Sequence, residues 1–108
     1  MQKTPKHFGL AHDSFVRIAD ACAHDVAYGR PQVAVIWQNL DAQIFVIDLK
    51  EYFRVHPYPA LHGTEGYLVV TYSISIVSGK GVAYAHVDGH YIYRESAYQR
   101  FLKLLMVK

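Results

Sequence analysis

The stretch YLVVTYSISIVSGKGVAYAHVDGHYIYR, residues 67–94, decides the fold of this chain. Alternating side chains along 67–77, 82–87 and 90–94 have the period of half-buried β-strands. Ser78-Gly79-Lys80-Gly81 separates the first two segments, and Asp88-Gly89, a strong hairpin signal, separates the last two. The stretch therefore predicts three antiparallel strands joined by tight turns.

Two shorter apolar segments precede this stretch, at residues 33–37 and 44–49. The turn residues Asn39 and Asp41 lie between them, which predicts a second hairpin. Residues 50–66 are rich in proline and glycine and predict an irregular loop.

A helix is predicted at each end of the chain. Residues 13–28 have apolar residues at helical spacing, with Asp13 as a candidate N-cap and Gly29 as a stop. The capping pattern Ser96-x-x-Gln starts the final helix. We predict an α+β fold: a single antiparallel sheet of about five strands, with an N-terminal and a C-terminal helix packed on one face. Residues 1–108 form a single compact domain, with 1–12 as a lead-in.

Composition excludes several classes of protein. The chain has 108 residues, 52% of them hydrophobic and 14% aromatic, which is typical of a small globular domain rather than a disordered one. The net charge is +2 and the basic residues are dispersed, which disfavours a dedicated nucleic-acid module. No apolar run approaches the ~18 residues of a membrane span, so no membrane partner is expected. Cys22 is the only cysteine, which predicts a reducing, cytoplasmic location.

The turns sort the side chains of the decisive stretch onto two faces. With Gly79-Lys80 and Asp88-Gly89 as loop residues, Val77 lies opposite Val82, and His86 lies opposite Ser73 and Tyr91. One face is apolar and is expected to lie under the helices: Leu68, Val70, Tyr72, Ile74, Ile76, Ala83, Ala85, Val87, His90 and Ile92. The other holds tyrosines, small hydroxyls and a histidine: Tyr67, Val69, Thr71, Ser73, Ser75, Val77, Val82, Tyr84, His86, Tyr91 and Tyr93.

We interpret the second face as the binding or interaction surface of a small module. Its predicted site residues, rimmed by the loop 56–66, are Ser73, Ser75, Tyr84, His86, Tyr91 and Tyr93. The small side chains of the serines leave room for a bound partner or ligand, and tyrosine rings combine an apolar body with a polar tip. Another copy of the chain, a small molecule or stacked single-stranded nucleic acid could cover this face, and an ordinary solvated face is the alternative. We favour a homodimer and expect no cofactor.

An enzyme is the second interpretation. His86, with a tyrosine as its partner, would act as an acid or base on a small ligand or an RNA. His86, Asp88 and His90 are also metal-ligating residue types. The register places the two histidines on opposite faces, so no metal site is predicted.

The segment Asp48-Leu49-Lys50 supports a third interpretation. An apolar strand that ends in acid-x-Lys resembles the second half of the motif of restriction-endonuclease-like nucleases. The resemblance implies that Asp48 helps to hold a divalent metal and that Lys50 orients the attacking water. That family also has an acidic residue near the preceding strand, and residues 33–37 contain none. The nuclease therefore ranks third.

Overall fold

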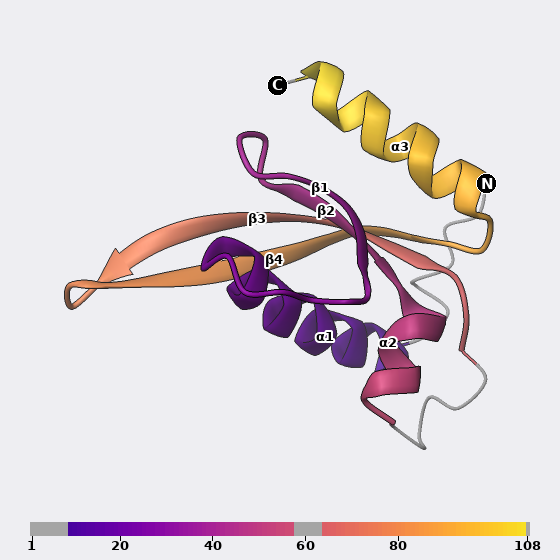
Figure 1. Ribbon diagram of the computed structural model, residues 1–108, viewed down its shortest axis with the longest axis horizontal. Helices are drawn as coiled ribbons and strands as arrows, with labels where there is room; N and C mark the ends of the chain where they lie inside the picture. Colours follow the sequence, from indigo (N-terminus) through magenta and orange to yellow (C-terminus); the bar gives the residue numbers. More distant parts are fainter. Residues whose placement is uncertain (1–8, 58–63, 108) are drawn as a thin grey trace.

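The computed structural model describes residues 9–57 and 64–107 (Figure 1). The elements follow in the order α1 (Gly9–Ala27), β1 (Val35–Asn39), β2 (Ile44–Asp48), α2 (Leu49–Val55), β3 (Tyr67–Val77), β4 (Lys80–Tyr91) and α3 (Arg94–Val107). The strands form one antiparallel sheet with the order β1-β2-β3-β4. The predicted α+β class with a single antiparallel sheet is confirmed.

The sheet has four strands rather than the predicted five, because Asp88-Gly89 does not turn the chain. Val87 pairs with Val70 and Gly89 pairs with Val69, so Asp88 is the extra residue of a β-bulge within β4. A Cβ at position 89 would lie 2.8 Å from the ring of Tyr91, so a larger residue there would displace this ring. The strand predicted at 90–94 is the end of β4 and the start of α3.

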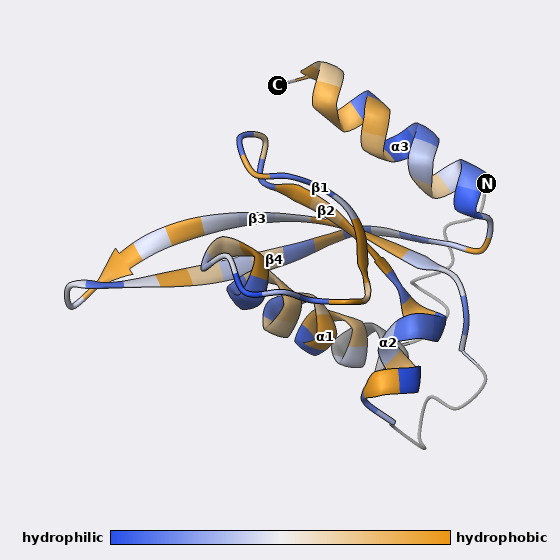
Figure 2. Ribbon diagram, in the orientation of Figure 1, coloured by the Kyte–Doolittle hydropathy of each residue, from blue (hydrophilic) through white to orange (hydrophobic). Residues whose placement is uncertain are grey.

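The two long helices cover opposite faces of the sheet, which corrects the prediction of one shared face (Figures 1 and 2). α1 packs on one face, against Phe45, Ile47, Leu68 and Val70. Ala97 and Phe101 of α3 pack on the other, against Ile44, Val46 and Val69. The reason lies in β2, because residues 44–47 are all fully buried and apolar. A strand that is apolar on both sides needs cover on both faces.

The helices differ from their predicted bounds at the ends. The apolar stripe of α1 is confirmed, since all of its predicted members are buried: Phe15, Ile18, Ala19, Cys22, Ala23 and Val26. The helix ends before Gly29 (φ +72°), as predicted, and begins at Gly9 rather than near Asp13. α3 begins at Arg94, ahead of Ser96. None of the helices in the described ranges is long and apolar enough to cross a membrane.

Part of the predicted irregular loop is helical. Residues 49–55 form α2, which Asp48 caps: its Oδ1 accepts hydrogen bonds from the backbone N–H groups of Lys50 (3.1 Å) and Glu51 (3.4 Å). Positions 58–63 of that loop, and positions 1–8 of the predicted lead-in, lie outside the described residues.

β3 and β4 continue past the rest of the sheet as a two-stranded ribbon (Figure 1). β2 pairs with β3 only as far as Thr71, whereas β3 and β4 stay paired to Val77 and Lys80. We call residues 72–86 the arm. Its turn is Ser78-Gly79, both at positive φ (51° and 78°), as a two-residue hairpin loop requires. The predicted loop, Gly79-Lys80, was one residue late, so Val77 lies opposite Lys80 instead of Val82.

Candidate functional site

The arm brings together four of the six predicted site residues. Alternation along the strands places Ser73, Ser75, Tyr84 and His86 on the face opposite α1, because Tyr72, Ala83 and Ala85 pack on the α1 side. Ser73 pairs with Tyr84, and His86 pairs with Thr71 rather than with the predicted Ser73. All four side chains are exposed, Tyr84 by 51%.

The other two predicted residues lie away from the arm. Tyr91 is at the far end of β4 from the turn, paired with Tyr67 rather than with the predicted His86, and it packs under α3. Tyr93 precedes α3 and is 72% exposed. Gly66 directly precedes β3, at the opposite end of that strand from Ser73 and Ser75. The described ends of the 56–66 loop therefore do not rim the arm.

Sequence analysis missed the exposure of the second face of the arm. Ile74 and Ile76 were expected to lie under a helix, yet their side chains are 47% and 72% exposed. They have the same alternation as Tyr72, which is buried, but they lie where the arm projects past the core. A length mismatch was the available signal, because an eleven-residue strand beside a five-residue one must project.

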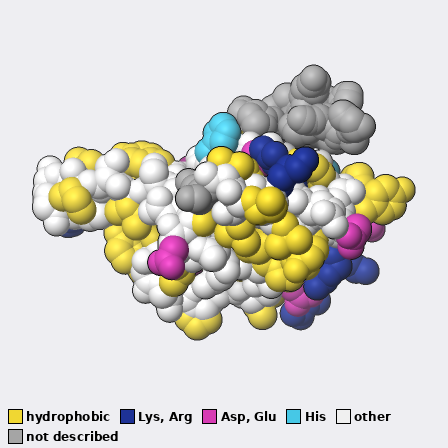
Figure 3. Space-filling view, turned by 90° about the horizontal axis from the view of Figure 1, so that it is seen from above, with side chains coloured by type: hydrophobic (Ala, Val, Ile, Leu, Met, Phe, Trp, Pro, Cys, Tyr) yellow, Lys and Arg dark blue, Asp and Glu magenta, His cyan; other side chains and the backbone are white. Residues whose placement is uncertain are grey.

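The arm is apolar and almost uncharged. Branched or aromatic side chains are exposed on both of its faces, namely Ile74, Ile76, Val77 and Tyr84. Lys80, in the first position after the turn, is the only Lys, Arg, Asp or Glu in residues 72–86. Figure 3 shows the arm at the left with hydrophobic patches, while most charged side chains gather at the opposite end of the molecule. A surface of this kind is typical of a protein–protein contact.

His90 is a structural residue rather than a candidate acid or base. It is 3% exposed, its ring lies 5.0 Å from that of Phe15, and its Nε2 lies 2.7 Å from the carbonyl oxygen of Glu65. Burial lowers the pKa of His90, and the hydrogen bond to Glu65 partly opposes this shift. His86 lies on the other face of the sheet, as the register predicted. Within the described ranges, no three His, Cys, Asp or Glu side chains are placed to hold a metal ion.

Asp88, the third metal-ligating residue type beside His86 and His90, holds α3 to the sheet. The bulge directs its carboxylate to Arg100 of α3, which donates two hydrogen bonds of 2.7 and 3.0 Å. The side chain of Asp88 is only 15% exposed. The contact with Asp88 raises the pKa of Arg100.

The segment that suggested a nuclease has a local structural role. Asp48 uses its carboxylate to cap α2, and Lys50 lies exposed in the first turn of that helix rather than at a strand end. These positions account for the acid-x-Lys spacing without a metal.

The pKa of the Cys22 thiol is raised to about 12, mainly by burial, so this thiol is unreactive.

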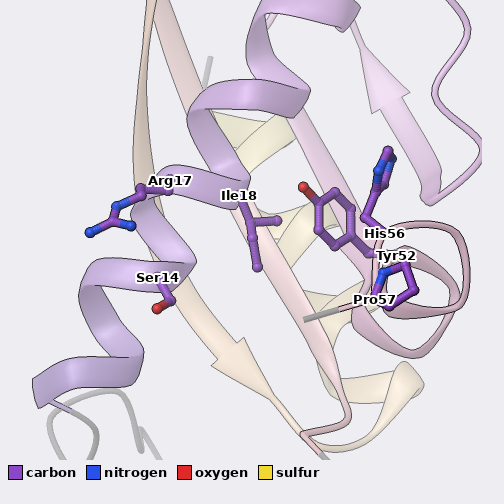
Figure 4. A pocket seen from close by; sticks show the side chains of 6 residues that line it. All are labelled: Ser14, Arg17, Ile18, Tyr52, His56 and Pro57. Atoms are coloured by element: carbon purple, nitrogen blue, oxygen red, sulfur yellow. The ribbon is translucent and has the colours of Figure 1, made fainter. Parts of the chain in front are cut away.

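A pocket of about 300 Å³ lies between α1 and α2 (Figure 4). It is lined by Ser14, Arg17, Ile18, Tyr52, His56 and Pro57. The Tyr52 ring packs 4.8 Å from that of His56, and burial raises the pKa of Tyr52, with smaller effects of Cys22 and Asp25. In Figure 4 the polar ends of Ser14 and Arg17 point away from Tyr52 and His56. A catalytic site would need polar groups that converge on one point, and the polar groups of this pocket do not converge.

A second, shallower pocket of about 490 Å³ is lined by Trp37, Arg94, Glu95 and Tyr98. Its aromatic surface is used internally: the Trp37 ring centroid lies 4.8 Å from that of Tyr98 and 5.0 Å from the Arg94 guanidinium carbon. Neither pocket includes any of the six predicted site residues. The arm therefore holds four of the five exposed site residues, and the fifth, Tyr93, lies apart from them.

No family model matches the chain, and neither a characterised protein nor a solved structure is significantly similar to it.

Proposed function

We propose that the protein is a self-associating interaction module and that the arm is its contact element. The exposed, nearly uncharged arm is the observation that carries the proposal. A two-stranded ribbon is marginal by itself in water, and no helix in the described part of the chain buries Ile74 or Ile76 in the outer half of the arm. A second copy would cover the side chains of Ile76 and Val77, which the monomer leaves in water.

The charge of the arm favours a second copy over other partners. Nucleic acid binding depends on cations that neutralise phosphates, and Lys80 is the only one in residues 72–86. A small molecule would need a concave pocket, and neither of the two pockets above is lined by arm residues. An enzyme with His86 as its base would need a site that excludes water, whereas His86 is exposed. A copy of the same neutral surface requires none of these features.

The location is part of the same proposal. We infer a reducing, cytoplasmic compartment, because the only cysteine is buried inside the α1 face of the core and no disulfide supports the fold.

The proposal is tested by the mass of the protein in solution. Sedimentation velocity is run over a dilution series on the unmodified protein, on Ile76→Lys and on Val77→Lys. Each substitution puts a charge on one face of the arm without touching the core. We expect a dimer for the unmodified protein and a dissociation constant raised ten-fold or more for both variants.

Ile92→Lys is the matched control, because Ile92 is 54% exposed, close to the 49% of Val77, and lies before α3 at the far end of β4. It should associate like the unmodified protein. A monomer at every concentration, or equal weakening by all three substitutions, would refute the proposal.

A further inference from the structure

The two outer edges of the arm differ in the hydrogen bonds that they form with the rest of the fold. On the β4 edge, α1 and the residue that follows it, Tyr28, supply partners for the backbone. Asp20 Oδ1 accepts a 3.0 Å hydrogen bond from the N–H of Ala85, and the Tyr28 hydroxyl donates to the carbonyl oxygen of Gly81. Covering an edge with a helix is one way in which proteins prevent unwanted strand pairing. These two hydrogen bonds occupy the β4 edge of the arm at Ala85 and Gly81.

Beyond Tyr72, none of the described residues covers the β3 edge with such hydrogen bonds. Tyr72 donates its N–H to the carbonyl oxygen of Gln43 (3.0 Å), away from β4, while its cross-strand partner Ala85 donates to Asp20. In an antiparallel ladder this outward orientation recurs at every second residue. The backbone groups of Ile74 and Ile76 therefore also point away from β4. No described residue outside the β3–β4 ladder forms a backbone hydrogen bond with either of them.

We infer that two copies join through this open edge, with β3 pairing antiparallel to β3 about a two-fold axis near Ser75. The inference rests on the proposed function and names the contact that performs it. In this register Ile74 of one copy lies opposite Ile76 of the other and exchanges both backbone hydrogen bonds with it. The two four-stranded sheets then form one continuous sheet, and the β4 edges of the two arms face away from each other.

The sequence of the edge is complementary to itself. Antiparallel pairing matches isoleucine with isoleucine on the α1 side and Ser75 with Ser75 on the other side. The only charge of the arm, Lys80, is on β4 and not on the pairing strand. An unrelated extended peptide could use the same edge, but nothing in the arm selects a charge or a bulky side chain from it, whereas a second copy matches the isoleucines with isoleucines and Ser75 with Ser75.

Proline substitution tests the edge without changing the surface charge. Ile74→Pro removes an N–H that the inference uses only between copies, whereas the β3–β4 ladder does not use it. The dissociation constant of the dimer should rise ten-fold or more, with an unchanged far-ultraviolet circular dichroism spectrum. Amide hydrogen exchange on the unmodified protein is the second measurement and needs no variant. The amides of Ile74 and Ile76 should exchange more slowly as the protein concentration rises.

The outcomes separate this inference from the proposed function. Two results would show that the arm is the contact element but that its β3 edge does not form the contact. One is that the lysine variants are monomeric while Ile74→Pro still dimerises; the other is that the amides of Ile74 and Ile76 exchange at the same rate in monomer and dimer. If the unmodified protein never dimerises, the proposed function fails. A dimer whose dissociation constant rises on addition of an excess of a peptide with the sequence of residues 72–78 would support the edge, because the peptide competes for it.

Discussion

Gly66 is the residue whose replacement tests the placement of β3 most directly. It has φ +107° and lies under the end of β4, where an added Cβ would be 2.6 Å from the carbonyl oxygen of Tyr91 and 2.8 Å from His90 Nε2. The chain cannot easily move away. The carbonyl oxygen of Gly66 accepts from the N–H of Leu49 (3.0 Å), and that of Glu65 lies 2.7 Å from His90 Nε2.

Gly66→Ala should therefore be strongly destabilising. The positive φ costs an alanine about 1 kcal/mol, and a shift that relieves the clash gives up two hydrogen bonds at about 1 kcal/mol each. The sum is about 3 kcal/mol, which lowers the melting temperature of a domain of this size by roughly 15 °C. Urea denaturation should show a lower midpoint with an unchanged slope.

Gly29→Ala is the matched control for this experiment. Gly29 has φ +72°, but an added Cβ would meet nothing within 4 Å, so only the backbone cost of about 1 kcal/mol applies. The difference of about 2 kcal/mol between the variants measures the clash and the lost hydrogen bonds. If Gly66→Ala loses no more stability than Gly29→Ala, the packing of residues 65–66 against His90 and Tyr91 is wrong.

Two further predictions concern charged and titrating groups. The pKa of His90 is lowered in the folded protein, so as the pH falls the unfolded chain binds a proton at this histidine before the folded protein does. The contribution of His90 to the free energy of unfolding should therefore be constant above the ordinary pKa of 6.5 and decrease as the pH drops below it. Denaturation over about pH 5 to 8 should show this decline in the unmodified protein and a shallower one in His90→Gln; equal slopes would contradict it. Asp88→Asn should lower the free energy of unfolding by about 1 kcal/mol and should accelerate amide hydrogen exchange in α3 before the rest of the fold. Glu51→Gln, which breaks an exposed ion pair with Arg54, is the control and should lower the free energy of unfolding by less. Uniformly faster exchange across the sheet in Asp88→Asn would show that this contact does not hold α3 in place.

The faces of the sheet could be predicted from the sequence even though two of the turns were misplaced. A two-residue hairpin at Asp88-Gly89 and a one-residue bulge both put Val87 and His90 on the same face. Moving the other loop from Gly79-Lys80 to Ser78-Gly79 shifts the register by two residues, which keeps every side chain on its face. The alternation of side chains therefore survives errors that change the strand count.

The features that could not be predicted depend on lengths and tertiary partners. Nothing local to Asp88 distinguishes a bulge from a turn, because Tyr91 and Arg100, which fix the bulge, are contacts made only in the folded chain. The exposure of Ile74 and Ile76 depends on where β2 ends, and the capping of the β4 edge depends on α1. Four of the six predicted site residues lie together because they follow strand alternation. Tyr91 and Tyr93 were assigned to a separate fifth strand, whereas Tyr91 ends β4 and Tyr93 precedes α3.

The hydrogen bonds of Asp20 and Tyr28 to the β4 edge have a consequence for the order of events during synthesis. α1 leaves the ribosome before β4, so Asp20 and Tyr28 are already present when the last strand is made. As the β3–β4 hairpin closes, its newest edge can be covered at once by a helix of the same molecule, before neighbouring nascent chains reach it. A circular permutant in which α1 follows β4 would have the same residues and final contacts, yet would spend part of its synthesis with that edge uncovered. Such a chain should yield less soluble protein than the natural order.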